Sequence, residues 1–191
     1  MGMLTPCNPE VYLDTAVDAL STAADWRAVL DELPVPIYTT DTAGGVTYWN
    51  RACVGLAGRE PQLGSDRWCV TWKIFTTSGD HLPHDRCPMA QAIQEKRIIR
   101  NVVAIAERPD GSRIAFRPYP TPLFDEHGVM TGAVNMLIDV TEEQSEALHE
   151  QAARCRRLAG SLYSRESMIV LAKMAEGFER TAAELSADND R

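Results

Sequence analysis

The residues that could carry chemistry in this chain are few and lie far apart. Cys87 precedes Pro88 at the expected start of a helix, and His84 lies three residues before Cys87. A helix N-terminus favours thiolate character, because the positive end of the helix dipole stabilises negative charge. The alternative is that Pro88 only starts the helix and Cys87 is a small buried residue. His81, His84 and Asp85 lack the spacing of a zinc motif, and no second pair of ligands accompanies them. We therefore expect free thiols and no metal site.

The composition restricts the classes of partner. The 191 residues include 19 Lys and Arg against 27 Asp and Glu, which gives a formal net charge of -8. This acidic balance argues against nucleic acid and anionic lipid, because both need clustered positive charge. No apolar run reaches the roughly 18–20 residues of a membrane-spanning helix, and no secretory signal is visible. Five cysteines without a C-x-x-C pair are typical of a reduced, cytoplasmic protein.

Helices are expected at both ends of the chain and strands in the middle. Asn8 and Pro9 make a good helix start, since a capping side chain is followed by a proline in the first turn. The hydrophobic periodicity predicts helices over 9–20, 21–33, 50–57, 88–96 and from 142 onwards. It predicts strands over 35–40, 46–49, 101–107, 113–124 and 131–140. The irregular stretch that contains Trp68, Trp72 and Phe75 is expected to form one or two short helices.

The last expected strand is largely apolar on both faces. Asn135 and Leu137 belong to one face, and Val134 and Met136 belong to the other. One face must cover the core, and the other needs a cover from the N-terminal helices, the C-terminal helix or a second subunit. Asn135 is polar among apolar neighbours, and a buried amide needs partners from a ligand, the backbone or bound water.

The C-terminal region has the pattern of a packed helix. Its apolar residues recur at alternating spacings of four and three, in the order Leu148, Ala152, Cys155, Ala159 and Leu162. This is the a/d seam of a coiled coil, although it covers only about two and a half heptads. Three arrangements remain open for the region from 142 to 185: one rod, a hairpin, or a coiled coil with a second chain.

Three motifs in this order resemble the PAS domain family. They are Asp41 to Arg59 with its Gly45 and Asn50, the turn Arg108-Pro109-Asp110-Gly111-Ser112, and Gly132 to Glu142 with its Asp139-Val140-Thr141. Residues 82–90 also resemble PAS modules of bacterial sensor histidine kinases. The resemblance implies an α+β fold, a five-stranded antiparallel sheet with short helices on one face. It divides the chain into an N-terminal helical cap (1–33), a PAS sensory core (34–141) and C-terminal signalling or dimerisation helices (142–191).

The resemblance implies a sensory and signal-transduction module. No nucleophile–base pair or Gly-rich phosphate loop supports catalysis, so we expect no enzyme activity. The signal would pass through Asp139 and Thr141, which are expected to cap the outgoing helix, and would leave through a homodimer or a partner kinase or regulator. A small ligand would bind between the sheet and the helices. The expected lining is Asn135, Leu137, Phe116, Ile114, Met89, Ile93 and Trp72, with core packing as the alternative for its apolar members.

Other functions are also open from the sequence. Haem-binding PAS relatives carry their ligands on the helix that begins here at Pro88, so a haem gas or redox sensor would use His84 or Cys87. A flavin is not expected, because the Asn-Cys-Arg-Phe-Leu-Gln motif of light-sensing relatives is absent. A ligand-free adaptor that docks on a kinase or transcription regulator is another alternative. His149 resembles a phosphoacceptor of sensor kinases, but the residues after it do not continue that pattern, and we expect a surface residue.

Overall fold

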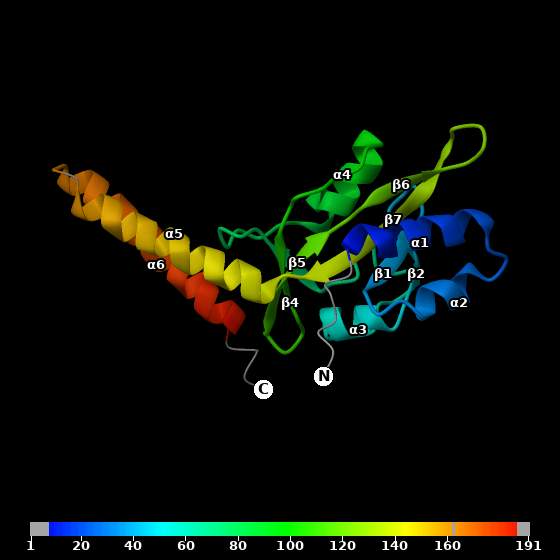
Figure 1. Cartoon of the computed structure of the whole chain (residues 1–191), viewed down its shortest axis with the longest axis horizontal. Helices are drawn as coiled ribbons and strands as arrows, with labels where there is room; N and C mark the ends of the chain where they lie inside the picture. Colours follow the sequence, from blue (N-terminus) through cyan, green and yellow to red (C-terminus); the bar gives the residue numbers. More distant parts are fainter. Residues whose placement is uncertain (1–7, 162, 187–191) are drawn as a thin grey trace.

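The computed structural model describes residues 8–161 and 163–186, so the predictions for Cys7 and Leu162 lie outside the described residues. The helices are α1 (Pro9–Thr22), α2 (Trp26–Asp31), α3 (Ala52–Ala57), the short 3-10 helix η1 (His84–Arg86), α4 (Pro88–Glu95), α5 (Thr141–Gly160) and α6 (Arg165–Ser186). The strands are β1 (Ile37–Thr40), β2 (Val46–Trp49), β3 (Lys73–Phe75), β4 (Ala104–Glu107), β5 (Arg113–Pro118), β6 (Thr121–Phe124) and β7 (Met130–Asp139). The expected α+β class is confirmed (Figure 1).

One antiparallel sheet forms the centre of the molecule. Its strand order is β2-β1-β7-β5-β4-β3, and β6 pairs with β7 beside this path. The expected single strand over 113–124 is divided into β5 and β6, which pair with successive parts of the ten-residue β7. Pro120 lies between them, and a proline has no N–H to donate to a strand ladder. The sheet therefore has more strands than the five expected.

The prediction of helices around Trp72 and Phe75 was wrong for the end of that stretch. Lys73–Phe75 is a strand that pairs with β4. The Nζ atom of Lys73 donates to Glu107 at 2.7 Å and fastens this edge. Three residues are too few to reveal a period of two in the sequence, so the strand is set by its tertiary partner.

Helices from both ends of the chain cover the outer face of the sheet (Figure 1). The α1–α2 pair packs on the half that contains β1, β2 and β7, with Leu13, Ala16 and Leu30 against Val134 and Met136. Asn8 caps α1 as expected, and α2 begins at Trp26 with Asp25 as its cap, later than the expected start at residue 21. Of the three expected covers, the structure thus uses the N-terminal helices on this half.

The C-terminal helices form the hairpin among the three arrangements that the sequence leaves open. Near its base, Leu148, Ala182 and Leu185 pack against Ile105 and Ala115 on the other half of the outer face. Two ion pairs also fasten the base, Arg117 to Glu143 at 2.7 Å and Arg113 to Glu184 at 2.6 Å. The remainder of the hairpin extends away from the sheet (Figure 1). None of the described helices is long and apolar enough to cross a membrane.

Candidate functional site

The inner face of the sheet carries a densely packed core. Five residues of the expected ligand pocket meet in this core: Leu137, Phe116, Ile114, Met89 and Ile93. All five are buried, so they pack against one another and against the neighbouring apolar side chains. Trp72 is 46% exposed and lies apart from them on the surface. The structure therefore brings most of the expected lining together as core and places Trp72 at a different site.

The side-chain oxygen and nitrogen of Asn135 each make a hydrogen bond within the protein. Its Nδ2 donates to the hydroxyl of Tyr38 at 2.9 Å, and its Oδ1 accepts from the backbone N–H of Tyr119 at 2.9 Å. The Tyr38 hydroxyl in turn donates to the carbonyl of Trp68 at 2.9 Å. Burial raises the pKa of Tyr38 well above its usual range, so the hydroxyl keeps its proton. These bonds join β7, β1 and the loop at Trp68.

Trp68 is held in an unusual backbone conformation. Its φ is +67°, and a bulky side chain makes such a positive φ energetically unfavourable. Its backbone N–H donates to the carbonyl of Gly44 at 2.6 Å. The indole lies against Gly44, where an added Cβ atom would come within 2.3 Å of the ring. Gly44 itself has a φ of +84°, so glycine is needed here for its conformation and for its size. The loop that contains Trp68 therefore packs tightly against the turn between β1 and β2.

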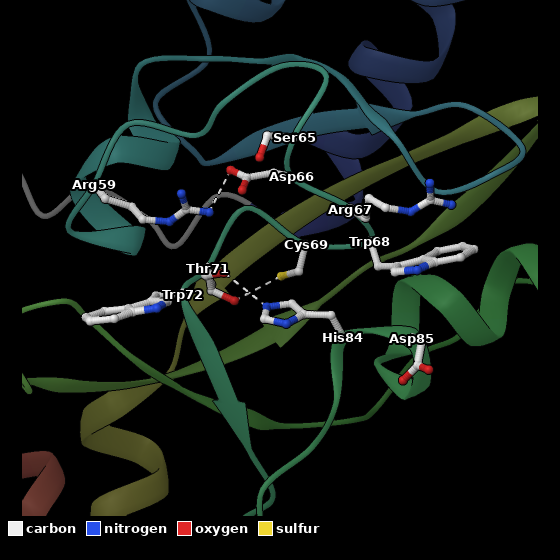
Figure 2. Close-up of a pocket in the computed structure, with 10 residues that line it drawn as sticks. All are labelled: Arg59, Ser65, Asp66, Arg67, Trp68, Cys69, Thr71, Trp72, His84 and Asp85. Carbon is white, nitrogen blue, oxygen red and sulfur yellow. Dashed lines mark hydrogen bonds and ion pairs between the residues drawn. The ribbon is translucent and has the colours of Figure 1, made fainter.

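A groove of about 460 Å³ opens beside this loop (Figure 2). Its lining is Arg59, Ser65, Asp66, Arg67, Trp68, Cys69, Thr71, Trp72, His84 and Asp85. Arg59 pairs with Asp66 at 2.6 Å on one wall, and the two indole rings lie at opposite ends of the groove. The groove combines two aromatic side chains with a larger number of charged and neutral hydrogen-bonding groups, so its lining is more polar than that of most small-molecule pockets.

His84 belongs to this groove, and one nitrogen of its ring is bonded by the protein itself. Its Nε2 lies 3.0 Å from the carbonyl oxygen of Thr71, so this nitrogen carries the proton and donates. Burial lowers the pKa of His84, and the ring is neutral at pH 7. Within the described parts of the chain, no group of three His, Cys, Asp or Glu side chains could hold a metal ion.

Cys87 does not have the thiolate character expected at a helix start. The residue is 1% exposed, and burial raises the pKa of its thiol to about 12. The loss of solvation outweighs the helix dipole, because the N-terminus of α4 faces the core and not the solvent. The thiol points to the Trp68 carbonyl at 3.8 Å. A protonated thiol in a packed core does not favour haem ligation by Cys87. Cys53, Cys69, Cys87 and Cys155 are free thiols.

The junction between β7 and α5 is built differently from the expected helix cap. The cap position is Val140, whose own side chain makes no capping hydrogen bond. Instead, Asp139 Oδ1 accepts from the N–H of Thr141 at 2.9 Å and from its hydroxyl at 2.6 Å. The Thr141 hydroxyl accepts from the N–H of Ala115 on β5 at 3.1 Å. Asp139 and Thr141 therefore tie the first turn of α5 to the sheet.

The fold and this junction agree with what a comparison of the whole sequence shows. The sequence profile described as PAS fold matches residues 30–145. The chain belongs to the PAS fold family. No curated protein matches the chain.

Three solved structures illustrate the similarity of this PAS chain to others. The Rhodobacter sphaeroides LOV protein is 16% identical, over 96% of this chain and 99% of that one, with a TM-score of 0.49. The LOV domain of a blue-light activated histidine kinase from Erythrobacter litoralis is 20% identical, over 57% and 98%, with a TM-score of 0.44. The PAS domain of a Colwellia psychrerythraea protein is 18% identical, over 61% and 94%, with a TM-score of 0.42.

Some residues that organise this PAS chain give little signal in the sequence. The contact between Tyr38 and Asn135 joins positions 97 residues apart, and nothing near Trp68 announces its positive φ. Gly44 is an exception, because the glycines that follow Asp41 predict a turn with positive φ. His149 is 52% exposed at its side chain and bonds Glu179 at 2.9 Å, so it lies on the surface of the hairpin.

Proposed function

We propose that the chain is a non-enzymatic sensory module that works as a homodimer. A small ligand occupies the groove between Trp68 and Trp72, and the change is passed through the sheet to the α5–α6 hairpin. The observation that carries the proposal is the continuous set of hydrogen bonds from Trp68 through Tyr38 to Asn135. Asn135 lies on β7, and the same strand ends at the junction with α5.

The coupling needs two arrangements of the junction that a ligand distinguishes. A ligand shifts an equilibrium only by the difference between its affinities for the two states. Trp68 is strained, and its carbonyl holds both the Tyr38 hydroxyl and the Cys87 thiol. A ligand that moves the Trp68 loop changes these bonds, and Tyr38 carries the change to β7. The output helix responds because Thr141 is bonded to both Asp139 and Ala115.

The ligand class follows from the lining of the groove. The Arg59–Asp66 pair offers both a donor and an acceptor, and the indole of Trp72 offers an exposed aromatic surface. A planar molecule with both hydrogen-bond donors and acceptors fits this chemistry.

Native mass spectrometry of the purified chain tests for a bound small molecule in this groove. We expect a bound small molecule that is lost in Trp72→Ala and retained in Leu63→Ala, a control with an exposed apolar side chain.

The coupling has its own test, which requires no ligand. In Tyr38→Phe the Trp68 carbonyl and the Asn135 amide each lose a partner. We expect faster hydrogen exchange at the first turn of α5 in this variant and no change in Tyr163→Phe, whose ring is fully exposed. An effect of Tyr38→Phe that stays confined to β1 would refute the relay. A chain that carries no small molecule would refute the ligand site.

A ligand-free adaptor is the second candidate function. The observation that favours it is the solid packing of the inner core, in which the expected pocket residues touch one another. The adaptor would dock on a kinase or a transcription regulator through the same hairpin. Because it binds no cofactor, its purified solution would show no haem or flavin absorbance. A coloured protein would refute the adaptor and would also correct the expectation that no flavin binds.

A further inference from the structure

The end of α6 meets the sheet through side-chain contacts and not through the chain itself. α5 follows β7 directly, whereas α6 returns to the sheet only after the hairpin has turned back (Figure 1). Ala182 and Leu185 pack against β4 and β5. Glu184 forms an ion pair with Arg113 of β5 at 2.6 Å. The end of α6 can leave the sheet without unfolding a strand, so the strength of these contacts decides where it lies.

A row of alternating charges crosses the strands at this contact. Lys73 on β3 lies opposite Glu107 on β4, and Glu107 lies opposite Arg113 on β5. The Lys73 Nζ donates to Glu107 Oε1 at 2.7 Å, and the Arg113 guanidinium donates to Glu107 Oε2 at 2.9 Å. Opposite charges at directly opposed positions stabilise neighbouring strands. Glu184 of α6 is the fourth member of the row, so its two cations and two carboxylates balance.

The centre of the row is largely shielded from solvent. The side chains of Arg113 and Glu107 are 19% and 16% exposed. The Arg113 guanidinium lies over the ring of Phe75, 4.4 Å from its centroid. Hydrogen bonds from Lys73 and Arg113 hold the pKa of Glu107 below its usual range, so this carboxylate is charged at neutral pH. Isolated surface ion pairs contribute little to stability, but a partly buried network of four charges is a stronger attachment.

The other end of the row reaches the groove. The Lys73 Nζ lies 5.2 Å from the ring centroid of Trp72, and Trp72 lines one end of the groove (Figure 2). A hydrogen-bond acceptor on a ligand stacked on Trp72 would therefore compete with Glu107 for the Lys73 ammonium. Without Lys73, one guanidinium faces two carboxylates, and the net charge of the row becomes -1. Glu184 is then held more weakly, because the charge of Glu107 repels it.

We propose that this row of charges is a latch, which holds the end of α6 on the sheet and opens when a ligand in the groove takes Lys73 from Glu107. The proposal deepens the regulation of the groove and rests on the proposed function for its ligand. It adds a second connection to the one through Tyr38, and this connection ends on α6 and not on α5. In the open state α5 keeps its attachment, since Thr141 is joined to the sheet by an uncharged hydrogen bond.

Hydrogen exchange of the full chain tests the latch. In Glu184→Gln we expect residues 181–186 to lose about tenfold in protection, with no change at the first turn of α5. In Lys73→Gln the same residues should lose about threefold, although Lys73 bonds Glu107 and lies on a different strand from Arg113. The double variant Lys73→Gln/Glu184→Gln should lose no more than Glu184→Gln alone, because both changes act through one row.

Two control variants separate the latch from a general effect of charge. Lys73→Arg keeps the positive charge and should keep the protection of the wild type. Arg156→Gln breaks a 2.7 Å ion pair with Glu179 that joins α5 to α6 away from the row, and it should change residues 181–186 by less than about twofold. Circular dichroism checks the folding of each variant. If Lys73→Gln is unfolded, Lys73→Met replaces it with the same expected loss.

The trigger is tested on the chain with and without its small molecule. Residues 181–186 should exchange more slowly in protein refolded from urea without that molecule than in protein as purified, and Lys73→Gln should show no such difference. A folded Lys73→Gln or Glu184→Gln variant with wild-type protection would overturn the latch and leave the ligand site intact. A purified chain that carries no small molecule would overturn the ligand site and the trigger together, even where Lys73→Gln loosens α6.

Discussion

Replacing Thr141 by valine removes one hydroxyl at the junction between the sheet and α5 and keeps the shape of the side chain. That hydroxyl donates to Asp139 at 2.6 Å and accepts from the N–H of Ala115 at 3.1 Å. Ala115 is fully buried, so its N–H loses a partner where water cannot replace it. Leaving a buried donor unsatisfied costs about 1–3 kcal/mol, and the lost bond to the carboxylate adds roughly 1 kcal/mol. We expect Thr141→Val to lower the free energy of unfolding by about 2–4 kcal/mol.

The matched control is Thr131→Val on β7, the strand that precedes α5. Thr131 is exposed, and its hydroxyl makes one bond, to the carbonyl of Leu123 at 3.3 Å. Urea denaturation should show a change of less than about 0.5 kcal/mol for this variant. Hydrogen exchange should locate the effect of Thr141→Val at Ala115 and the first turn of α5, with protection reduced by about 30-fold or more. If the two variants lose similar stability, the junction is not held by the Thr141 hydroxyl and the argument fails.

Two further predictions concern the Trp68 loop and the buried thiols. Gly44→Ala should lower the free energy of unfolding by at least about 2 kcal/mol and shift the tryptophan fluorescence, because the new methyl group meets the Trp68 ring. The control is Gly64→Ala, at a glycine with a similar positive φ and no neighbouring atom within 4 Å. In urea denaturation this control should cost only about 1 kcal/mol. An equal loss of stability in both variants would show that backbone strain alone accounts for the effect of Gly44→Ala. Burial raises the pKa of both Cys53 and Cys87 from about 9 to about 12, so the stability from their protonated thiols should be complete below pH 9 and decline as pH rises toward 12. The native chain should accordingly react with Ellman's reagent at pH 8 at these two thiols only on unfolding, and rapid native labelling of Cys53 or Cys87 would contradict their burial.

Patterns of period two and of period 3.6 revealed much of the fold in advance. The two apolar faces of β7 predicted that the sheet would need covers on both sides, and the a/d spacing of Leu148, Ala152 and Cys155 predicted their burial. The division between β5 and β6 was signalled by the prolines, although its consequence for pairing was not. Features that depend on contacts between distant segments, such as the strand β3, could not be obtained in this way.

The candidate site was harder to predict than the fold, for two physical reasons. For Cys87 the sequence left two possibilities open, a thiolate at a helix start and a buried small residue, and only tertiary packing decides between them. The groove is built by a loop whose shape follows from the contact of Trp68 with Gly44, and no local pattern encodes that contact. Asn135 was recognised correctly as a buried amide in need of partners, but its partner Tyr38 is remote in sequence.

The hairpin has a mechanical consequence, because both of its ends are fixed to the sheet and its tip is not. Thr141 holds the beginning of α5, and Glu184 holds the end of α6 through Arg113. A length of about 30 Å makes the hairpin a lever whose pivot lies at β5. A rotation of roughly 10° at the pivot would displace the tip by about 5 Å, whereas the atoms at the pivot would move by a fraction of that distance. Small rearrangements of a single hydroxyl could thus be read as large displacements by whatever contacts the far end.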